Sequence, residues 1–585
     1  MRRLARWDAE ISAFDRTNLR ISNLRLLTAG IAILTAAPVM RGTAPSWWLL
    51  GPAIVFVGLV VAHARMLAAT DRARRARAWY ERGVARMEGR WSGSGATGAR
   101  FLAGQPFAAD LDVFGQGSVF QLLNTARTEA GEDTLAGWLL TGAPPAEIRD
   151  RQAAVAELRP NVDFRERLAA TTVGAHTGRT GRLTTWATKP SAGLAPIWAV
   201  VFAMVGLTSA TLLVASYREL IDGRALAISI LIQTALAAAF WRKSAAAFEG
   251  LDEAGQDLAV LTELLERIEG EQFRSPRLQR LRDSLQTQGA MPSRRIVGLM
   301  RLINWNDSTR NQIFAPIALL LMVPFVLAVL IDRWHARYAR AINGWLQAIG
   351  DIEAFAALAT YAYEHPAAPF PTVVEDGPVF VATSLEHPLI ASGVAVANDV
   401  SIGGTHPHLL LVSGSNMSGK STLLRAIGVN VVLAQAGAPV RAASLTLSPL
   451  EIGSSLRIED SLQAGHSRFY AEILRIRAIV DLTRQPKPLL FLLDEVLAGT
   501  NSHDRRIGAQ AVVRTLVEHG AIGLVTTHDL ALADVVSTMA PGLAANVHFE
   551  DRIENGTMVF DYRMRPGVVE HSNALALMRA IGLDV

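Results

Sequence analysis

The stretch HLLLVSGSNMSGKS, residues 408–421, decides the fold of the C-terminal part of this chain. It begins with an apolar run of strand length, His408–Ser413, and continues with the pattern GxxxxGK[ST] from Gly414 to Ser421. Residues 422–436 then have a helical sequence. Strand, glycine-rich loop and helix in this order are the setting in which the pattern binds phosphates. The stretch therefore predicts an α/β P-loop domain that binds ATP or GTP.

Each part of the loop is expected to contact the nucleotide in its own way. Its glycines let backbone N–H groups close around phosphate oxygens, and the dipole of the following helix favours negative charge. Lys420 is expected to reach the β- and γ-phosphates, and the Ser421 hydroxyl to hold Mg²⁺. The residues predicted to bind ATP are Gly414, Ser415, Asn416, Met417, Ser418, Gly419, Lys420, Ser421 and Thr422.

A second apolar run, LLFLL at residues 489–493, ends in two acidic residues. An acidic residue at the end of a buried strand can hold the Mg²⁺ shell, so Asp494 is predicted to bind metal together with Ser421. Glu495 is then placed to polarise the attacking water as a general base. The alternative is a pair of solvated carboxylates, and the five apolar residues before the pair argue against it.

A third apolar run, GLVTT at residues 523–527, ends at His528. An imidazole in this position can contact the γ-phosphate or the attacking water, whereas a lone histidine more often has a structural role. The position at a strand end favours the functional role. Glu495 and His528 are therefore the predicted catalytic residues.

Two apolar segments near the N-terminus approach the length of roughly 20 residues that a membrane crossing needs. They are Leu24–Met40 and Trp47–Ala64, separated by a short loop. Arginines are frequent before the first segment and after the second, and only Arg41 lies between them. This asymmetry places both flanks in the cytoplasm and predicts a transmembrane hairpin. The alternative is a cleaved signal peptide, which the second apolar segment disfavours.

A second transmembrane hairpin is predicted from Leu194–Ser216 and Ala225–Trp241, neither of which contains a charged residue. The alternative for this pair is two buried core helices. Ile313–Ile331 is a further apolar run, but a fifth crossing would place the nucleotide site outside the cell, where ATP is scarce. We therefore expect a buried or membrane-skimming helix there, kinked by Pro316 and Pro324.

The composition fits a protein with membrane segments. Half of the 585 residues are hydrophobic and the mean hydropathy is +0.23, which is more apolar than an ordinary soluble enzyme. The chain has no cysteine, which excludes disulfides, thiolate metal sites and cysteine nucleophiles. Its net charge of +4 does not single out nucleic acid as a partner, because arginines that flank membrane segments contribute to it.

With these elements in order, the chain resembles the MutS family of DNA mismatch repair ATPases. Asn416-Met417 is similar to part of the family's phosphate loop. The segment DEVLAGTNSHD, residues 494–504, looks like the family's DE-x-x-x-GT-x-S-x-D segment, and TTH, residues 526–528, looks like its ATH motif. The resemblance implies ATP and Mg²⁺ as cofactors and a homodimer of ATPase domains paired head to tail.

The segment DSLQAGHSRFYAE, residues 460–472, resembles the family loop that carries Ser-Thr-Phe. The resemblance implies that Ser467 touches ATP bound to the opposite subunit. Arg468 and Tyr470 replace the usual threonine and methionine, so the details of that contact differ from the family pattern. Upstream, LDVFG at residues 111–115 and the segments that follow it look like the family's core helical domain.

The mismatch-reading domain of the family is not matched. No Phe-x-Glu wedge occurs before the core, and the first apolar hairpin occupies that end of the sequence. Mismatch recognition therefore does not carry over residue by residue.

The predicted architecture is an α/β P-loop ATPase domain of the ABC class, preceded by an all-α MutS-like core and lever domain that carries transmembrane hairpins. The predicted divisions are residues 1–90 for the first hairpin with its basic flanks, 91–193 for the first part of the helical core, 194–243 for the second hairpin, 244–365 for the lever and core helices, and 366–585 for the ATPase domain.

The predicted function is ATP hydrolysis that drives dimer closure, in a protein related to DNA mismatch repair. We expect a multi-pass protein of the inner (cytoplasmic) membrane with its ATPase domain in the cytoplasm. Binding of mismatched or branched DNA is the first hypothesis for the output, with the arginine-rich residues 72–90 as a candidate contact with phosphates. A positive-inside anchor is the favoured alternative for that stretch. The alternative function is a membrane-anchored mechanochemical or scaffold ATPase without mismatch recognition.

Overall fold

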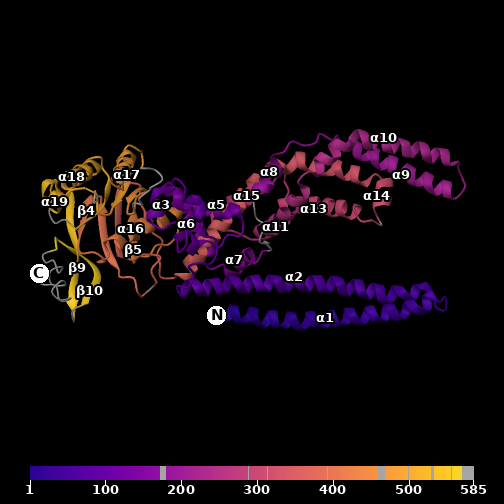
Figure 1. Cartoon of the computed structure of the whole chain (residues 1–585), viewed down its shortest axis with the longest axis horizontal. Helices are drawn as coiled ribbons and strands as arrows, with labels where there is room; N and C mark the ends of the chain where they lie inside the picture. The colour runs from indigo at the N-terminus through magenta and orange to yellow at the C-terminus, as the bar shows by residue number, and fades with distance from the viewer. Residues whose placement is uncertain are drawn as a thin grey trace.

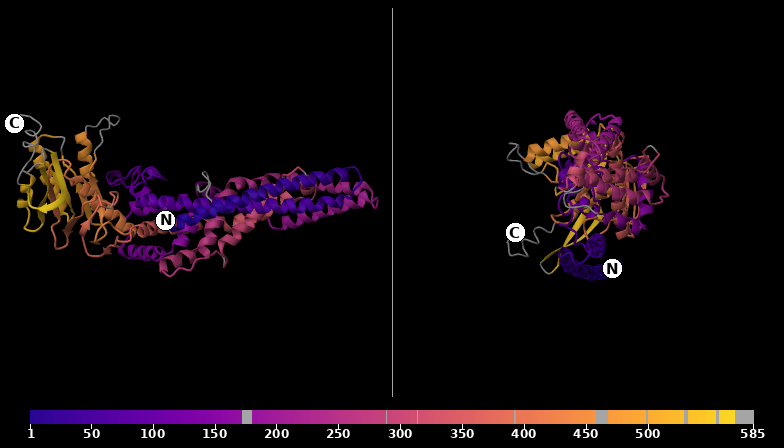
Figure 2. Two further views of the ribbon diagram at one scale, coloured as in Figure 1. Left: turned by 90° about the horizontal axis from the view of Figure 1, so that it is seen from below. Right: turned by 90° about the vertical axis from the view of Figure 1, so that its right-hand side faces the viewer.

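The computed structural model describes residues 1–171, 180–287, 289–312, 314–391, 393–457, 468–497, 500–528, 532–554 and 557–569. The molecule is elongated, with the C-terminal strands at one end and two helical hairpins that point away from them at the other (Figure 1). An end-on view shows the first hairpin standing apart from the other helices (Figure 2). The two hairpins are therefore separate projections from one helical body.

The first hairpin consists of α1 (Arg2–Met40) and α2 (Leu50–Met87), joined by the short 3-10 helix η1 (Ser46–Leu49). Both helices contain the apolar segments that the sequence predicts. Their apolar side chains face outward, and Leu26 and Ile54 are each about 70% exposed (71% and 70%). The helix α2 continues without a break past its apolar part, so the membrane-type segment and the segment that docks on the core are one rigid rod.

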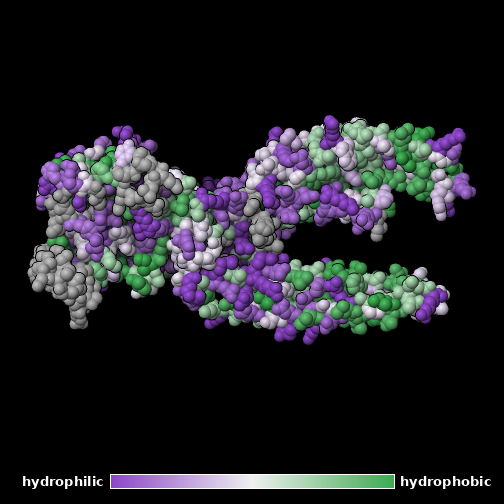
Figure 3. Space-filling view, in the orientation of Figure 1, coloured by the Kyte–Doolittle hydropathy of each residue, from purple (hydrophilic) through white to green (hydrophobic). Residues whose placement is uncertain are grey.

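The second hairpin consists of α9 (Ile197–Tyr217) and α10 (Gly223–Phe248). Among the described residues, four helical stretches are long and apolar enough to cross a membrane, and they correspond to the helices of these two hairpins. Figure 3 shows extended hydrophobic surface on both hairpins.

The apolar run at 313–331 does not form one kinked helix, so that prediction is wrong. It is divided into α14 (Ala315–Leu320) and the start of α15 (Val323–Glu364), and Met322 between them has a φ of +51°. Pro316 and Pro324 lie in the first turns of these helices, where a missing N–H has no cost. The prolines therefore start two helices, and the break lies between Leu320 and Val323.

The break is packed tightly against the second hairpin. The Gln233 side-chain amide donates a hydrogen bond to the Leu320 carbonyl at 2.8 Å and another to the Ser209 hydroxyl at 2.8 Å. A Cβ added at Gly206 would lie 2.4 Å from the Leu321 carbonyl oxygen, so α9 meets this backbone directly. Gln233 thus satisfies a carbonyl that the break would leave free in apolar surroundings.

The helical body is built around α15, which has 42 residues. Its second half is buried on nearly every side, from Ala348 to Ala362. The remaining helices of the body pack around it or beside it, and they are η2 (Ala99–Phe101), α3 (Pro106–Asp110), α4 (Val119–Leu123), α5 (Glu129–Leu140), α6 (Pro145–Leu158), α7 (Val162–Ala169), α8 (Thr180–Thr188), α11 (Leu251–Glu269), α12 (Pro276–Ser284) and α13 (Pro292–Thr309). The helix α15 thereby connects the second hairpin to the start of the C-terminal domain.

The C-terminal domain contains a six-stranded sheet of order β10-β9-β4-β8-β7-β6, in which only the β9–β10 pair is antiparallel. Its strands are β4 (Leu409–Ser413), β6 (Glu451–Ser455), β7 (Leu489–Leu493), β8 (Ile522–Thr527), β9 (Ala544–Glu554) and β10 (Thr557–Pro566). Every residue of β4, β7 and β8 is buried, as expected for parallel strands covered on both faces. The flanking helices are α16 (Lys420–Ala436), α17 (Arg468–Leu482), α18 (Ser502–Glu518) and α19 (Asp534–Thr538).

A second, four-stranded sheet has the order β1-β5-β2-β3. Its strands are β1 (Thr372–Val373), β2 (Val379–Leu385), β3 (Asn398–Gly403) and β5 (Ser444–Leu447). Because β4, β7 and β8 are adjacent and parallel, the loop after β4, the acidic pair after β7 and the histidine after β8 emerge at one edge of the larger sheet. Ligands of open α/β sheets bind at this edge.

Candidate nucleotide-binding site

The loop between β4 and α16 has a backbone that only glycine accepts at two positions. Gly414 has a φ of +146° and Gly419 a φ of +107°. A Cβ at Gly414 would lie 3.0 Å from the Phe549 carbonyl oxygen, and a Cβ at Gly419 would lie 3.2 Å from the Tyr562 ring. Both glycines of the pattern are therefore required by conformation and by the strands β9 and β10 above them.

Lys420 begins α16 and folds back over the loop. Its amino group donates hydrogen bonds to the carbonyl oxygens of Gly414 at 2.9 Å and Ser415 at 2.7 Å. Burial lowers the pKa of the Lys420 amino group, and the nearby carboxylates of Glu495 and Asp494 oppose that shift. The amino group is thus held inside the loop by two backbone carbonyls.

The loop also contains hydroxyl groups that no protein atom satisfies. Within the described part of the chain, the buried hydroxyl oxygens of Ser415 and Ser418 have no hydrogen-bond partner. Buried polar groups in folded proteins are almost always hydrogen-bonded, so unpaired ones call for an explanation such as a bound ion or ligand. A loop with a buried ammonium and two unpaired hydroxyls fits a phosphate group.

Asp494 connects the ends of three elements. One carboxylate oxygen accepts a hydrogen bond from the Ser421 hydroxyl at 2.5 Å, and the other accepts one from the Thr526 hydroxyl. A serine hydroxyl and a carboxylate side by side at a strand end are the donor set that P-loop enzymes use for Mg²⁺. The structure brings the two predicted metal-binding residues, Ser421 and Asp494, into contact.

Glu495 has a φ of +52°, and its backbone N–H donates to the Thr526 hydroxyl at 3.0 Å. Its side chain is in hydrogen-bond contact with the His528 imidazole through Nε2. The other ring nitrogen of His528 lies 3.1 Å from the Gly414 carbonyl oxygen. His528 therefore bridges the carboxylate of Glu495 and the loop, and the two predicted catalytic residues lie side by side.

A buried glutamate on α17 supports the turn that carries Glu495. The Leu497 backbone N–H donates to the Glu472 carboxylate at 2.5 Å, and Leu497 has a φ of +58°. Glu472 is only 3% exposed. The sequence analysis assigned Glu472 no role. A glutamate between the apolar residues Ala471 and Ile473 of α17 could have indicated a buried carboxylate.

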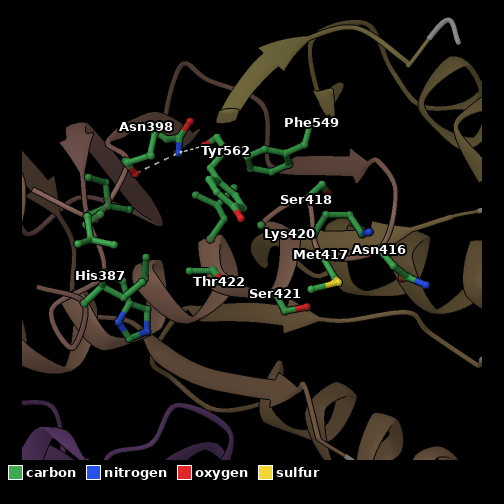
Figure 4. Close-up of a pocket in the computed structure, with 18 of the residues that line it drawn as sticks. His387, Asn398, Asn416, Met417, Ser418, Lys420, Ser421, Thr422, Phe549 and Tyr562 are labelled. Carbon is green, nitrogen blue, oxygen red and sulfur yellow. Dashed lines mark hydrogen bonds between the residues drawn. The ribbon is translucent and has the colours of Figure 1, made fainter. Parts of the chain in front are cut away.

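A cavity of about 510 Å³ opens beside the loop. Its walls include the loop and α16 on one side and residues of β9, β10 and the β2–β3 connection on the other (Figure 4). The β2–β3 connection contributes the apolar side chains of Ile390 and Val394, and the rings of Phe549 and Tyr562 line the cavity close to Gly419. This combination of an anion-binding end and an apolar end fits the phosphates and the base of a nucleotide.

Two polar residues fix the shape of the apolar end. Asn398 donates a hydrogen bond to the Tyr562 carbonyl at 3.0 Å and accepts one from the Met564 N–H at 2.7 Å, which ties β10 to β3. Burial lowers the pKa of His387 to about 4, so its imidazole is neutral at pH 7. Sequence reasoning missed His387, Asn398 and Tyr562, because they come from segments far from the loop in sequence and have no local motif.

The helical body contacts the domain close to this site. The buried Asp110 on α3 accepts hydrogen bonds from the Ser454 hydroxyl at 2.7 Å and from the Leu456 N–H at 3.2 Å, at the end of β6. Asp112 pairs with Arg457 at 2.7 Å. Ser467, which is predicted to act on the opposite subunit's ATP, lies outside the described residues.

The family model described as MutS domain V matches residues 410–584, which include the loop, the acidic pair and His528. A DNA mismatch repair protein MutS from Brevibacillus brevis is 30% identical over 259 residues, which are 43% of this chain and 29% of the relative. An Endonuclease MutS2 from Thermomicrobium roseum is 35% identical over 223 residues, 36% of this chain and 26% of the relative. Residues 410–584 are therefore similar to the MutS family in its domain V.

The similarity to MutS proteins is partial in extent. A probable DNA mismatch repair protein Msh6 from Drosophila melanogaster is 28% identical over 316 residues, which are 51% of this chain and 25% of the relative. The chain thus spans between about a quarter and 29% of the lengths of these MutS relatives. Both helical hairpins lie outside the residues that match MutS domain V.

Proposed function

We propose that the chain is a membrane-anchored MutS-type ATPase of the ABC class that hydrolyses ATP to ADP and phosphate with Mg²⁺. One observation carries this proposal. The Lys420 loop, the Ser421–Asp494 pair and the Glu495–His528 pair meet at one edge of the sheet, at the anion-binding end of the cavity.

The residues divide the chemistry between them. Lys420 and the loop N–H groups hold the phosphates, and Ser421 and Asp494 hold Mg²⁺, which neutralises charge on the phosphate oxygens. Glu495 accepts the proton of the attacking water as general base. His528 orients the Glu495 carboxylate and keeps it beside the loop. The apolar end of the cavity, with Tyr562, takes the base.

We further propose that two ATPase domains pair, with Ser467 of each completing the site of the other. Exposed apolar side chains in the loop and on α17 support this pairing. Met417 in the loop is 84% exposed, and Tyr470 and Leu474 on α17 are 46% and 42% exposed. Such side chains clustered on a surface commonly mark protein interfaces.

The proposed location is the inner membrane, with the ATPase domain in the cytoplasm. Each hairpin begins and ends at the helical body, so both leave the same side of the bilayer (Figure 1). The four apolar helices make an even number of crossings. The end of α15 at Glu364 and the start of β1 at Thr372 support the proposed domain boundary at residue 366.

A link to DNA mismatch repair is the second proposal, and the names of the MutS relatives support it. Three arginines of α2, Arg74, Arg77 and Arg86, do not favour DNA contact at that helix, because they pair within the chain. Arg74 pairs with Asp15 at 3.3 Å, and Arg86 pairs with Glu364 at 2.6 Å. Filter binding of mismatched and branched duplexes at two salt concentrations tests this link, since phosphate contacts give a steep salt dependence. Retention that is absent or flat in salt contradicts it.

The proposed ATPase is tested by Glu495→Gln. We expect the variant to retain ATP, because the loop is unchanged, and to lose turnover by 100-fold or more, on the order of a general base's contribution. Phosphate release and nucleotide retention on the detergent-solubilised protein measure the two effects. The exposed Glu518→Gln, at the far end of α18, is the matched control and should behave as the parent. Full turnover in Glu495→Gln would remove Glu495 from this role.

A further inference from the structure

The end of the first hairpin is bound to the last residue of α15. The Arg86 guanidinium at the end of α2 makes two parallel hydrogen bonds to the Glu364 carboxylate, at 2.7 and 2.6 Å. The two side chains are only 7% and 6% exposed. Two-pronged pairs of this kind are directional as well as strong, so they fix the angle between the helices that carry them.

The rest of the cytoplasmic part of α2 is seated on α7. Trp79 packs against Val162 and Ala169, and the Arg75 side chain donates to the Ala170 carbonyl at 2.9 Å. These contacts hold the side of α2 against α7. Arg86 is the contact that ties its end to α15.

A second buried arginine joins the same three helices. Arg165 on α7 is 2% exposed and donates to the Thr360 hydroxyl of α15 at 2.9 Å. Its guanidinium lies 5.9 Å from the Trp79 ring of α2 and 5.0 Å from the Tyr363 ring of α15. The interface of α2, α7 and the end of α15 therefore contains two buried arginines, Arg86 and Arg165.

Glu364 places this interface next to the start of the C-terminal domain. Glu364 is the last residue of α15, and the chain enters the ATPase domain at β1 eight residues later, at Thr372. The other end of α15 packs on the second hairpin, where the rings of Phe325 and Phe202 are in contact. The Asp332 carboxylate also accepts the Ala192 and Leu194 N–H groups just before α9. The helix α15, roughly 60 Å long at 1.5 Å per residue, thus holds one hairpin near each end.

We propose that the Arg86–Glu364 pair couples the first membrane hairpin to the nucleotide state of the ATPase domain. The pair converts a movement of the ATPase domain at the end of α15 into a movement of α2 as a rigid rod. Coupling between two sites is reciprocal in binding free energy, so a change imposed on the hairpin also changes nucleotide affinity. This inference rests on the proposed ATPase function.

The pair suits this role better than the other ion pairs of α2. Arg74–Asp15 and Arg77–Asp8 join α2 only to α1, and their side chains are 41–58% exposed. Exposed pairs contribute little, whereas removal of one partner from a buried pair leaves an uncompensated charge. Loss of Arg86 should therefore uncouple α2 from α15, and loss of Arg74 should not.

Hydrogen–deuterium exchange of the whole chain in detergent tests the proposal. The parent is the Glu495→Gln chain, which is expected to hold ATP without turnover, compared with and without Mg²⁺-ATP. We expect ATP to change uptake in two sets of peptides, those of the loop at 414–422 and those of α2 at 70–87. With Arg86→Met added, the change in α2 should be lost while the change in the loop remains.

Three further variants make the result specific. Arg74→Met should keep both changes. Arg86→Glu and Glu364→Arg should each lose the α2 change, and the double variant, which restores the pair with reversed polarity, should recover it. The double variant also covers the case in which Arg86→Met fails to fold.

The outcomes separate the two proposals. No ATP-dependent change in the loop peptides of the parent overturns the proposed nucleotide site. A change in the loop without any change in α2 of the parent overturns the coupling alone. An α2 change that persists in Arg86→Met also overturns the coupling, because the pair is then only a structural contact.

Discussion

The two hairpins are attached to the helical body by different chemistry. The first docks through ion pairs and polar contacts, with Arg86–Glu364 buried at its end. The second packs through close helix contact, with the Gly206 backbone against Leu321 and the Gln233 amide on the Leu320 carbonyl. Polar docking through a buried pair fixes the angle of the first hairpin, whereas backbone-to-backbone packing makes the second hairpin part of the helical body itself.

The largest expected effect breaks the tight packing of the second hairpin. Gly206→Leu places side-chain atoms where Leu321 backbone atoms lie 2.4–2.8 Å from an ideal Cβ, and backbone cannot move aside easily. We expect a loss of about 3 kcal/mol or more, as for severe overpacking. Thermal unfolding in detergent measures it. Gly58→Leu in the first hairpin is the matched control, since no atom lies within 4 Å of its Cβ position. Equal stability of the two variants would show that the hairpins are attached alike.

The next largest effect concerns the pH dependence of stability that arises from a buried glutamate of α15. Glu364 has Arg86 as partner, whereas Glu353 accepts hydrogen bonds from the N–H groups of Arg127 and Thr128 and from the Thr128 hydroxyl. Burial, opposed by these hydrogen bonds, raises the pKa of Glu353 to about 7. Because the folded-state pKa is raised, the protonated form stabilises the fold, and this stability is lost as the pH rises from about 4.5 to 7.

Glu353→Gln should remove that pH dependence. The parent should lose stability between pH 5 and pH 8 by up to about 3 kcal/mol relative to Glu353→Gln, at 1.36 kcal/mol per pKa unit. Unfolding midpoints across this range measure the difference. Parallel pH profiles of the two proteins would contradict the expected titration of Glu353.

The smallest effect tests the polar contact within the second hairpin. Gln233→Met keeps the side-chain volume but removes the donor to the Leu320 carbonyl and the Ser209 hydroxyl. We expect a loss of about 1 kcal/mol, because hydrogen bonds between membrane helices contribute little. The Thr234→Val variant, whose hydroxyl bonds only within α10, is the control for the same measurement. A loss as large as that of Gly206→Leu would mean that the amide, and not close packing, holds the break.

Sequence motifs predict the parts of the site that lie within one loop or at the end of one strand. The glycine-rich loop and the strand-end residues Asp494, Glu495 and His528 meet because β4, β8 and β7 are adjacent and parallel. Parallel neighbours have their carboxyl ends at the same edge of the sheet. The division of the run at 313–331 is different, because Leu321 and Met322 carry no turn signal. The break forms where α9 and Gln233 pack on it, so only the tertiary structure reveals it.

Long-range partners escape sequence reasoning for a related reason. Arg86 and Glu364 are 278 residues apart, and each alone reads as an ordinary charge at a helix end. The cavity wall formed by His387, Asn398 and Tyr562 likewise comes from segments with no shared motif. The convergence of the loop and the strand-end residues was therefore predictable, but the opposite wall of the cavity and the connection to the hairpin were not.

Because α2 is uninterrupted, its length also sets the distance between the proposed bilayer and the C-terminal domain. If its apolar segment lies in a bilayer, as proposed, residues 65–87 extend roughly 35 Å beyond the lipid at 1.5 Å per residue. The C-terminal domain then lies away from the lipid surface, with the helical body between them.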